Sequence, residues 1–275
     1  MLNLKAQKLV GSIPASVGNL TYITGINLID NNLHGEIPPE MDRRQSLQYL
    51  NFSHNSFCGK IPNNLSQCTQ LRLLNLESNR IKGSIPNQLS SLLGLKHLWL
   101  YGNNLTGTIP PWMGNFSLLS SPFLGENNFQ GSIPNEERAP TLELLLIRLE
   151  EFAAKANNLS SLVPSSVYNI SSIKVLAVTQ NQLNRELPPN VSKILPNLAV
   201  FHYAASNFTR NIPVSLSNAS SLQLFDLGTN GLTGTLPNLG SLQSLLWLNF
   251  EGNSLGSGKK SDLNSPWDYS WVKRK

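Results

Sequence analysis

Hydrophobic residues recur in a fixed order around one asparagine along most of the chain. Aligned segments read INLIDNNLHGEIP from Ile26, LNFSHNSFCGKIP from Leu50, LNLESNRIKGSIP from Leu74 and LWLYGNNLTGTIP from Leu98. The first five asparagines are spaced 24 residues apart, and Gln7 and Ser206 stand at the same place in two deviant copies. The full series of asparagines is Asn31, Asn55, Asn79, Asn103, Asn127, Asn157, Asn181, Asn230 and Asn253. Eleven copies of one template indicate a repeat protein.

Each position of the template has a physical role. The L-x-L pair alternates with period two, which predicts a short strand with both leucines turned into the core. We expect the asparagine amide to bond backbone groups of neighbouring turns, each bond contributing roughly 1 kcal/mol. The following G-x-I-P buries its isoleucine, and its proline ends strand pairing. These prolines are Pro14, Pro38, Pro62, Pro86 and Pro110.

One repeat cannot bury its own leucines, so neighbouring repeats must stack. The pattern predicts an α/β solenoid over residues 1–255, with about eleven turns. Its parallel sheet lines the concave face and short or 3₁₀ helices lie outside. With strands about 4.8 Å apart, the sheet is roughly 50 Å long.

Two segments depart from the repeat. Asn127 and Asn157 are 30 residues apart, and the excess falls at 135–151. Leu149 keeps the phase of the next strand. We therefore expect the six extra residues to loop out before Leu149 and to form an extra helical turn or two on the outer side. A gene-model or splicing irregularity is the leading interpretation. Residues 256–275 have no repeat signal, and their Gly, Ser and Lys content favours disorder.

The L-x-G-x-I-P signature at this spacing closely resembles the plant-specific class of leucine-rich repeats. That class occurs in receptor-like kinases, receptor-like proteins and polygalacturonase-inhibiting proteins. Stretches such as LVGSIPASVGNLTYITGINL and LQYLNFSHNSF resemble the immune receptors of the bacterial elongation-factor and rice bacterial-blight types. The resemblance spans residues 2 to about 263. It implies a peptide or protein ligand, a leucine-rich-repeat co-receptor kinase as partner, and a place outside the plasma membrane or in the apoplast.

The resemblance leaves three hypotheses open. The first is the extracellular ligand-recognition part of a receptor for defence or developmental signalling. The second is a secreted inhibitor of a pathogen enzyme, as in the polygalacturonase-inhibiting proteins. The third is a non-functional remnant, suggested by the 30-residue repeat and by the loss of the family pattern at both ends. Relative to the family, we expect this chain to be truncated, without signal peptide, transmembrane helix or Ser/Thr kinase domain.

Composition argues against other classes of function. The net charge is +5, but the last twenty residues hold +3 of it, so the body lacks the basic stripe of a nucleic-acid binder. No apolar stretch is long enough to span a membrane. The N-terminus has no apolar run of the signal-peptide type, because Lys5, Gln7 and Lys8 interrupt it. Four scattered histidines and two cysteines, Cys58 and Cys68, do not form a recognisable set of metal ligands. We therefore expect no catalysis, cofactor or metal, and leave the pairing of the two cysteines open.

Ten N-x-S/T triplets indicate a secretory origin with several glycosylated sites. Four of them, Asn19, Asn115, Asn169 and Asn218, share one phase at an exposed site on the outer side, and Asn104, Asn158 and Asn207 each follow the repeated asparagine directly. Asn51 is the exception, because alternation assigns it to the concave sheet. The nine sites expected to carry glycans are Asn19, Asn64, Asn104, Asn115, Asn158, Asn169, Asn190, Asn207 and Asn218.

The position of each residue relative to the repeated asparagine also predicts the candidate ligand surface. Residues two or four before each asparagine should project from the concave face, and most are small or polar. His97, Trp99 and Tyr101 alternate on one strand, with Phe123 on the next and Glu77 on the preceding one. Exposed aromatic residues of this kind form binding hot spots, but cross-strand stacking explains them equally well. A weaker cluster consists of His202, Asp226 and Glu251, for which ordinary solvated surface is the favoured interpretation.

Overall fold

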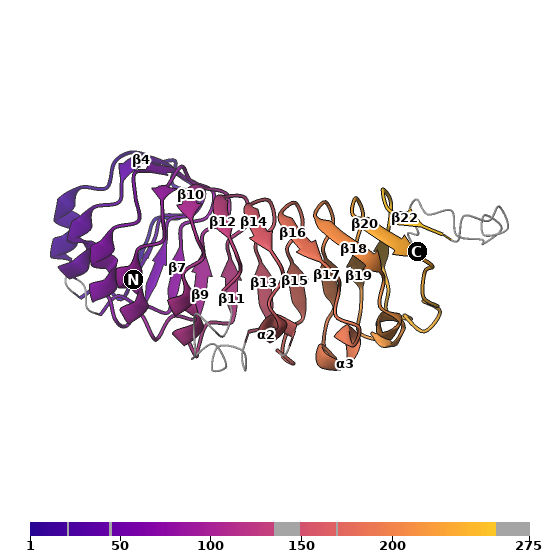
Figure 1. Cartoon of the computed structure of the whole chain (residues 1–275). Coiled ribbons are helices and arrows are strands. Elements are labelled where there is room, and N and C mark those ends of the chain that lie inside the picture. Colours follow the sequence, from indigo (N-terminus) through magenta and orange to yellow (C-terminus); the bar gives the residue numbers. More distant parts are fainter. Residues whose placement is uncertain (21, 44–45, 135–148, 169, 257–275) are drawn as a thin grey trace.

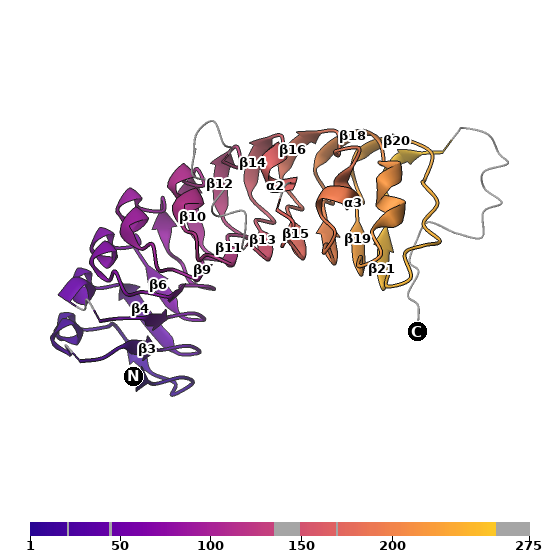
Figure 2. The same cartoon turned by 90° about the horizontal axis from the view of Figure 1, so that it is seen from below.

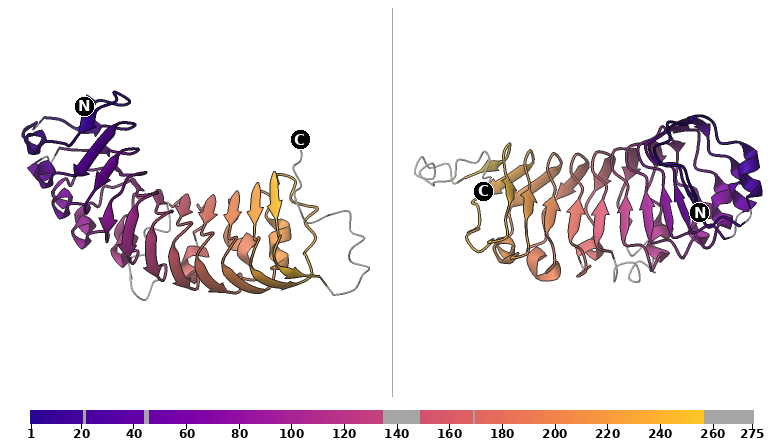
Figure 3. Two further views of the ribbon diagram at one scale, coloured as in Figure 1. Left: turned by 90° about the horizontal axis from the view of Figure 1, so that it is seen from above. Right: turned by 180° about the vertical axis from the view of Figure 1, so that it is seen from behind.

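A parallel sheet runs along the inside of a curved solenoid, with its strands in chain order (Figure 1). The computed structural model describes residues 1–20, 22–43, 46–134, 149–168 and 170–256. Two further views show the arc, with this sheet on its concave side and the helical segments outside (Figures 2 and 3). Its eleven strands, counted over those residues, are β1 (Leu2–Asn3), β3 (Gly25–Asn27), β5 (Tyr49–Asn51), β7 (Leu73–Asn75), β9 (His97–Trp99), β11 (Ser121–Phe123), β13 (Glu151–Ala153), β15 (Val175–Ala177), β17 (Val200–His202), β19 (Leu224–Asp226) and β21 (Trp247–Asn249). The α/β solenoid predicted from the sequence is confirmed.

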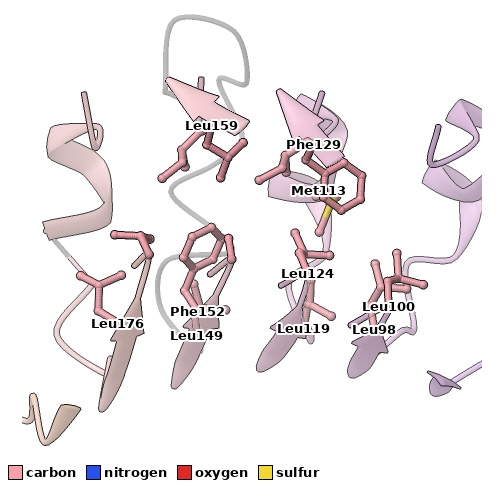
Figure 4. Close-up of a cluster of buried hydrophobic side chains, with 14 of the residues drawn as sticks. Leu98, Leu100, Met113, Leu119, Leu124, Phe129, Leu149, Phe152, Leu159 and Leu176 are labelled. Atoms are coloured by element: carbon pink, nitrogen blue, oxygen red, sulfur yellow. The ribbon is translucent and has the colours of Figure 1, made fainter. Parts of the chain in front are cut away.

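The core consists of leucines that stack in rows along the solenoid. Leu74 pairs with Leu50 on one side and Leu98 on the other, and all three are at most 1% exposed. Figure 4 shows such rows continuing from Leu98 and Leu100 across the following turns. Complete burial of an aliphatic side chain contributes roughly 1.5–3 kcal/mol, so the stacked repeats stabilise one another.

The repeated asparagines join each turn to the one before it. The Nδ2 of Asn103 donates to the carbonyl of Leu76 in the preceding turn at 2.9 Å and to that of Leu100 at 3.1 Å. Its Oδ1 accepts the amide N–H of Ile81 at 3.0 Å. The same pattern recurs at Asn31, Asn55, Asn79, Asn127, Asn157, Asn181, Asn230 and Asn253. This asparagine ladder satisfies backbone groups that the sheets leave unpaired, as the sequence predicted.

A second layer of parallel strands lies on the flank of the solenoid, and the sequence interpretation missed it. After each asparagine the chain stays extended, with its apolar residue buried and its neighbours exposed, as in β10. Eight strands form one sheet: β8 (Lys82–Gly83), β10 (Asn104–Gly107), β12 (Asn128–Gly131), β14 (Asn158–Ser161), β16 (Gln182–Arg185), β18 (Asn207–Asn211), β20 (Gly231–Gly234) and β22 (Ser254–Leu255). Three more continue the layer: β2 (Val10–Gly11), β4 (Asn32–Glu36) and β6 (Ser56–Cys58).

Short helices form the outer side, as expected. Proline fixes the extended residue before several of them, with φ of −63° at Pro62 and −69° at Pro110. The 3₁₀ helices are η1 (Ala15–Asn19), η2 (Pro39–Arg43), η3 (Asn63–Gln67), η4 (Asn87–Ser91), η5 (Pro111–Asn115) and η6 (Val214–Asn218). Two single-turn α-helices, α2 (Ser165–Tyr168) and α3 (Val191–Ile194), take the same place in later repeats.

The long repeat keeps its register with the rest of the sheet. Leu149 is 3% exposed, and Phe123 of β11 pairs directly with Ala153 of β13. The extra helical turn predicted within 135–151 falls mostly on residues 135–148, and the tail on 257–275, both outside the described residues.

The two cysteines are not joined. Cys58 is exposed on the flank, whereas Cys68 is buried and its thiol contacts the carbonyl of Met41 at 3.4 Å.

Candidate functional site

Three rows of side chains cover the concave sheet, one residue per strand in each row. His97 pairs with Ser121 in the first row, and Trp99 pairs with Phe123 in the second. Tyr101 follows Trp99 by two residues and belongs to the third row. Backbone pairing therefore brings these sequence-predicted residues onto one surface, across β9 and β11.

The aromatic rings contact one another on this surface. Trp99 and Phe123 are stacked, with centroids 5.6 Å apart and 15° between the ring planes. The His97 ring lies 5.7 Å from that of Trp99 at 56°. All these side chains remain half-buried rather than enclosed. We call His97, Trp99, Tyr101 and Phe123 the aromatic patch; cross-strand stacking and partial exposure occur there together.

Two ring nitrogens in the patch lack a partner among the described residues. His97 Nδ1 and Trp99 Nε1 are both buried without a hydrogen bond. Burial lowers the pKa of His97, Lys96 acts in the same direction, and Glu151 on the neighbouring concave surface opposes them. His97 is therefore neutral at neutral pH.

A charged pair that the sequence interpretation did not single out borders the patch. Lys155 Nζ lies 3.2 Å from Glu126 Oε1 and 5.1 Å from the centroid of the Tyr101 ring. A Cβ on Gly125 would lie 3.0 Å from Lys155 Cγ and 3.2 Å from Tyr101 Cδ2, so glycine leaves room for both side chains. Burial raises the pKa of Tyr101, and hydrogen bonding to Glu126 adds to the rise. Lys155 stands two residues before Asn157, so the rule that selected Tyr101 also pointed to it.

Glu77 lies one strand before Tyr101 in the third row and is half-buried. Its amide donates to Asn75 Oδ1 at 2.9 Å. The predicted acidic neighbour of the aromatic patch is thus in place.

The second predicted cluster is only partly assembled. His202 Nε2 and Asp226 Oδ2 lie 3.2 Å apart on adjacent strands. Asp226 is 8% exposed and its Oδ1 accepts the Gly228 amide at 2.9 Å, so it is not ordinary solvated surface. Glu251 is exposed in the third row, and no contact of its side chain with the other two is found in the described part of the chain. The pair lies three strands beyond Phe123, about 14 Å along the sheet.

The predicted glycosylation sites divide by exposure. Asn51 is 6% exposed, and its Oδ1 accepts both the amide and the hydroxyl of Ser53. Eight predicted sites are exposed: Asn19, Asn64, Asn104, Asn115, Asn158, Asn190, Asn207 and Asn218. Asn169 lies outside the described residues.

Two searches of the described residues gave negative results. They contain no group of three or more His, Cys, Asp or Glu side chains placed to hold a metal ion. None of their helices has both the length and the apolar character to span a bilayer.

Comparison with known proteins identifies the architecture. The Leucine Rich Repeat profile matches residues 46–68, 70–92 and 94–116. A search of curated protein sequences gives no significant match. Among solved structures, a TDR receptor is 31% identical with a TM-score of 0.86, and the match covers 92% of this chain and 43% of that one.

Two further structures share the fold. The plant peptide hormone receptor RGFR1, in complex with RGF2, is 29% identical with a TM-score of 0.76, over 90% of this chain and 42% of that one. A plant ice-binding protein is 28% identical with a TM-score of 0.77, over 90% of this chain and 78% of that one. The chain thus spans less than half the length of either receptor.

Proposed function

We propose that this chain, which belongs to the leucine-rich-repeat receptor ectodomains of plants, recognises a peptide on the concave face of its solenoid. The observation that carries the proposal is the aromatic patch. His97, Trp99, Tyr101 and Phe123 project from two adjacent strands and keep part of their surface open to solvent. Rigid, partly exposed aromatic rings contribute large contact area at low entropic cost, which is typical of binding hot spots.

The polar surroundings of the patch support a peptide rather than a featureless apolar ligand. Glu77, Glu126 and Lys155 border the rings and offer charges of both signs. Eight predicted sequons are exposed, whereas Asn51 on the concave sheet is buried and bonded. Glycans on the exposed sites would leave the concave face accessible.

The shared fold does not by itself select the ligand, because one similar structure is an ice-binding protein and another holds a peptide hormone. The proposal therefore rests on the side chains of this concave face. By family resemblance we place the chain outside the plasma membrane or in the apoplast, in defence or developmental signalling. A leucine-rich-repeat co-receptor kinase is the partner expected there, and binding rather than catalysis is the role of these repeats.

Selection from a phage-displayed library of random 12-residue peptides tests the proposal. Peptides that bind the immobilised chain should lose at least tenfold in affinity on Trp99→Ala or Phe123→Ala. The matched control is Trp112→Ala, because Trp112 lies in η5 on the outer side, where its Nε1 donates to Asn87 Oδ1. Failure to select peptides sensitive to Trp99→Ala but insensitive to Trp112→Ala would contradict the proposal.

A further inference from the structure

Three cationic side chains gather on the flank of the early repeats, away from the concave face. Arg80 and Lys82 donate their amides to the carbonyls of Phe57 and Gly59 in the preceding turn, both at 2.8 Å. They are two residues apart on one extended segment, so their side chains project from the same side of the flank. Lys60 lies just beyond β6 in the preceding turn, and all three side chains are exposed. We call Lys60, Arg80 and Lys82 the basic patch.

A glycine brings Lys60 onto the neighbouring turn. Gly83 has a φ of +82°, and a Cβ there would lie 3.2 Å from Cγ of Lys60, 3.5 Å from its Cδ and 3.6 Å from its Cε. The aliphatic stem of Lys60 therefore lies across Gly83 and carries the ammonium group toward the segment that holds Arg80 and Lys82. The three charges are gathered by the stacking of the turns, because a side chain at position 83 would push Lys60 away.

The basic patch has no acidic partner. The ion pairs found within the described residues all lie elsewhere on the solenoid. Glu36 of the preceding flank strand β4 leans over Gly59, where a Cβ would lie 2.7 Å from its Oε1, just as Lys60 leans over Gly83. Both side chains lean toward the following turn, so Lys60 points away from Glu36. Cations without a paired carboxylate are free to bind an anionic ligand.

The surface around the patch is polar and carries no apolar anchor. Ser84, Thr106 and Thr108 are exposed beside it and offer hydroxyl groups. None of the large exposed hydrophobic side chains in the described chain lies on β4, β6, β8 or β10. Protein and peptide partners are held mainly by buried aromatic or aliphatic anchors, which this surface lacks. Charge and hydroxyl groups together fit a hydrated, anionic sugar polymer.

We propose that the basic patch binds a carboxylated polysaccharide on the flank of the solenoid. Carboxylates along the polymer pair with the three cations, and its hydroxyl groups bond to the neighbouring serine and threonine side chains. Charges closer together than the Debye length, about 8 Å at physiological salt, act jointly on such a ligand. Three cations are too few for the basic stripe of a nucleic-acid binder. This site is separate from the aromatic patch, so the inference goes beyond the proposed function and does not depend on it.

The probes are short polygalacturonate oligomers and the same oligomers with every carboxylate methyl-esterified. The wild type should bind the acid form, with an affinity that falls as salt is added, and should not bind the ester. Lys60→Gln/Arg80→Gln/Lys82→Gln should weaken binding of the acid form roughly tenfold, because each exposed charge contact contributes a small factor. Lys60→Arg/Lys82→Arg keeps the charges and should keep the affinity.

The matched control is Lys5→Gln/Lys8→Gln/Lys96→Gln. These three lysines are also exposed but lie outside the patch, and their loss changes the net charge by the same amount. The control should bind the acid form within about twofold of the wild type, because a local cluster rather than the net charge holds the ligand. All variants should melt at the temperature of the wild type, which separates lost binding from lost folding.

A predicted glycan site borders the patch, since Asn104 of β10 pairs with Lys82 of β8. The measurements are therefore made on chain secreted from plant cells and repeated on its Asn104→Gln variant. The secreted wild type should bind the acid form. Binding seen only after Asn104→Gln would overturn the proposal, because the glycan would then cover the patch in the natural protein.

The remaining outcomes also decide. Equal losses in the patch variant and the control variant would reduce the effect to net charge and overturn the site. Poly-glutamate that binds as tightly as the acid oligomers would overturn the assignment to a polysaccharide. Trp99→Ala should leave oligomer binding unchanged, and a loss there would move the ligand to the concave face. Failure to select any Trp99-dependent peptide would overturn the proposed function and leave the basic patch standing.

Discussion

Trp99 and Phe123 stack across neighbouring strands of the concave sheet, with ring centroids 5.6 Å apart and planes 15° from parallel. Twenty-four residues separate them in the chain, and the repeat alone brings them together. Such a stack stabilises the sheet and presents a continuous apolar surface to solvent. It can therefore serve both folding and recognition.

The folding contribution of the stack is measurable without a ligand. In a double-mutant cycle of Trp99→Ala and Phe123→Ala, the coupling free energy should be about 0.5–1.5 kcal/mol, as for other aromatic pairs. Equilibrium unfolding in urea provides the four values. A coupling of zero would show that the rings do not stabilise one another in solution.

The asparagine ladder has a gap at Ser206. This residue occupies the ladder position between Asn181 and Asn230, and its Oγ is buried without a partner in the described structure. Ser206→Asn should restore hydrogen bonds to the neighbouring turns and raise the free energy of unfolding by roughly 1–3 kcal/mol. Thermal unfolding checks the sign.

Asn181→Ser is the reciprocal control for the ladder. Asn181 Nδ2 donates to the carbonyls of Ala154 and Val178, both at 2.9 Å, and its Oδ1 accepts the Leu159 amide at 3.0 Å. Its loss should destabilise the protein by about 2–4 kcal/mol, because buried backbone groups lose their partners. A lower stability of the Ser206→Asn variant would contradict this account. It would show that the neighbouring turns are packed to fit serine and leave no room for an asparagine at this ladder position.

Glycan occupancy should follow exposure. In chain secreted from plant cells, we expect glycans on Asn104, Asn158 and Asn207, which begin the flank strands β10, β14 and β18. Asn51 should stay unmodified, because its amide group is buried and bonded to Ser53. Mass spectrometry of glycopeptides separates the sites. A glycan on Asn51 would contradict the placement of that residue.

The lowered pKa of His97 gives the stability a pH dependence. In the unfolded chain this histidine protonates near its ordinary pKa of 6.5, and in the folded chain only at lower pH. The unfolded state therefore binds more protons between these two values, and stability is lost as the pH falls through that window. His97→Gln should remove this part of the acid dependence, as measured by urea unfolding at pH 5–8. An imidazole that titrates above 6.5 by NMR would contradict the assigned direction.

The sequence predicted the features that recur at the same position in every repeat. Leu74, Leu98 and the ladder asparagines stand at one phase, so one physical argument covers every turn. The flank sheet was missed because its strands, such as Asn104–Gly107, are short and begin in a turn-like sequence of asparagine, threonine and glycine. Their pairing is imposed by the stacking of the turns rather than by strand propensity.

The sequence predicted the candidate site only where the alternation of side chains along a strand decides which face they occupy. Trp99, Tyr101 and Phe123 were assigned to the concave face because phase alone decides that. The burial of Asp226 and the contact of Lys155 with Glu126 depend on neighbouring turns, which a single-strand pattern does not describe.

Amide hydrogen exchange, with and without a selected peptide, tests the recognition surface most directly. Bound peptide should slow exchange on the concave side around β9 and β11, which carry the aromatic patch, and leave the flank strands and outer helices unchanged. Protection confined to the flank or the outer helices would contradict the account.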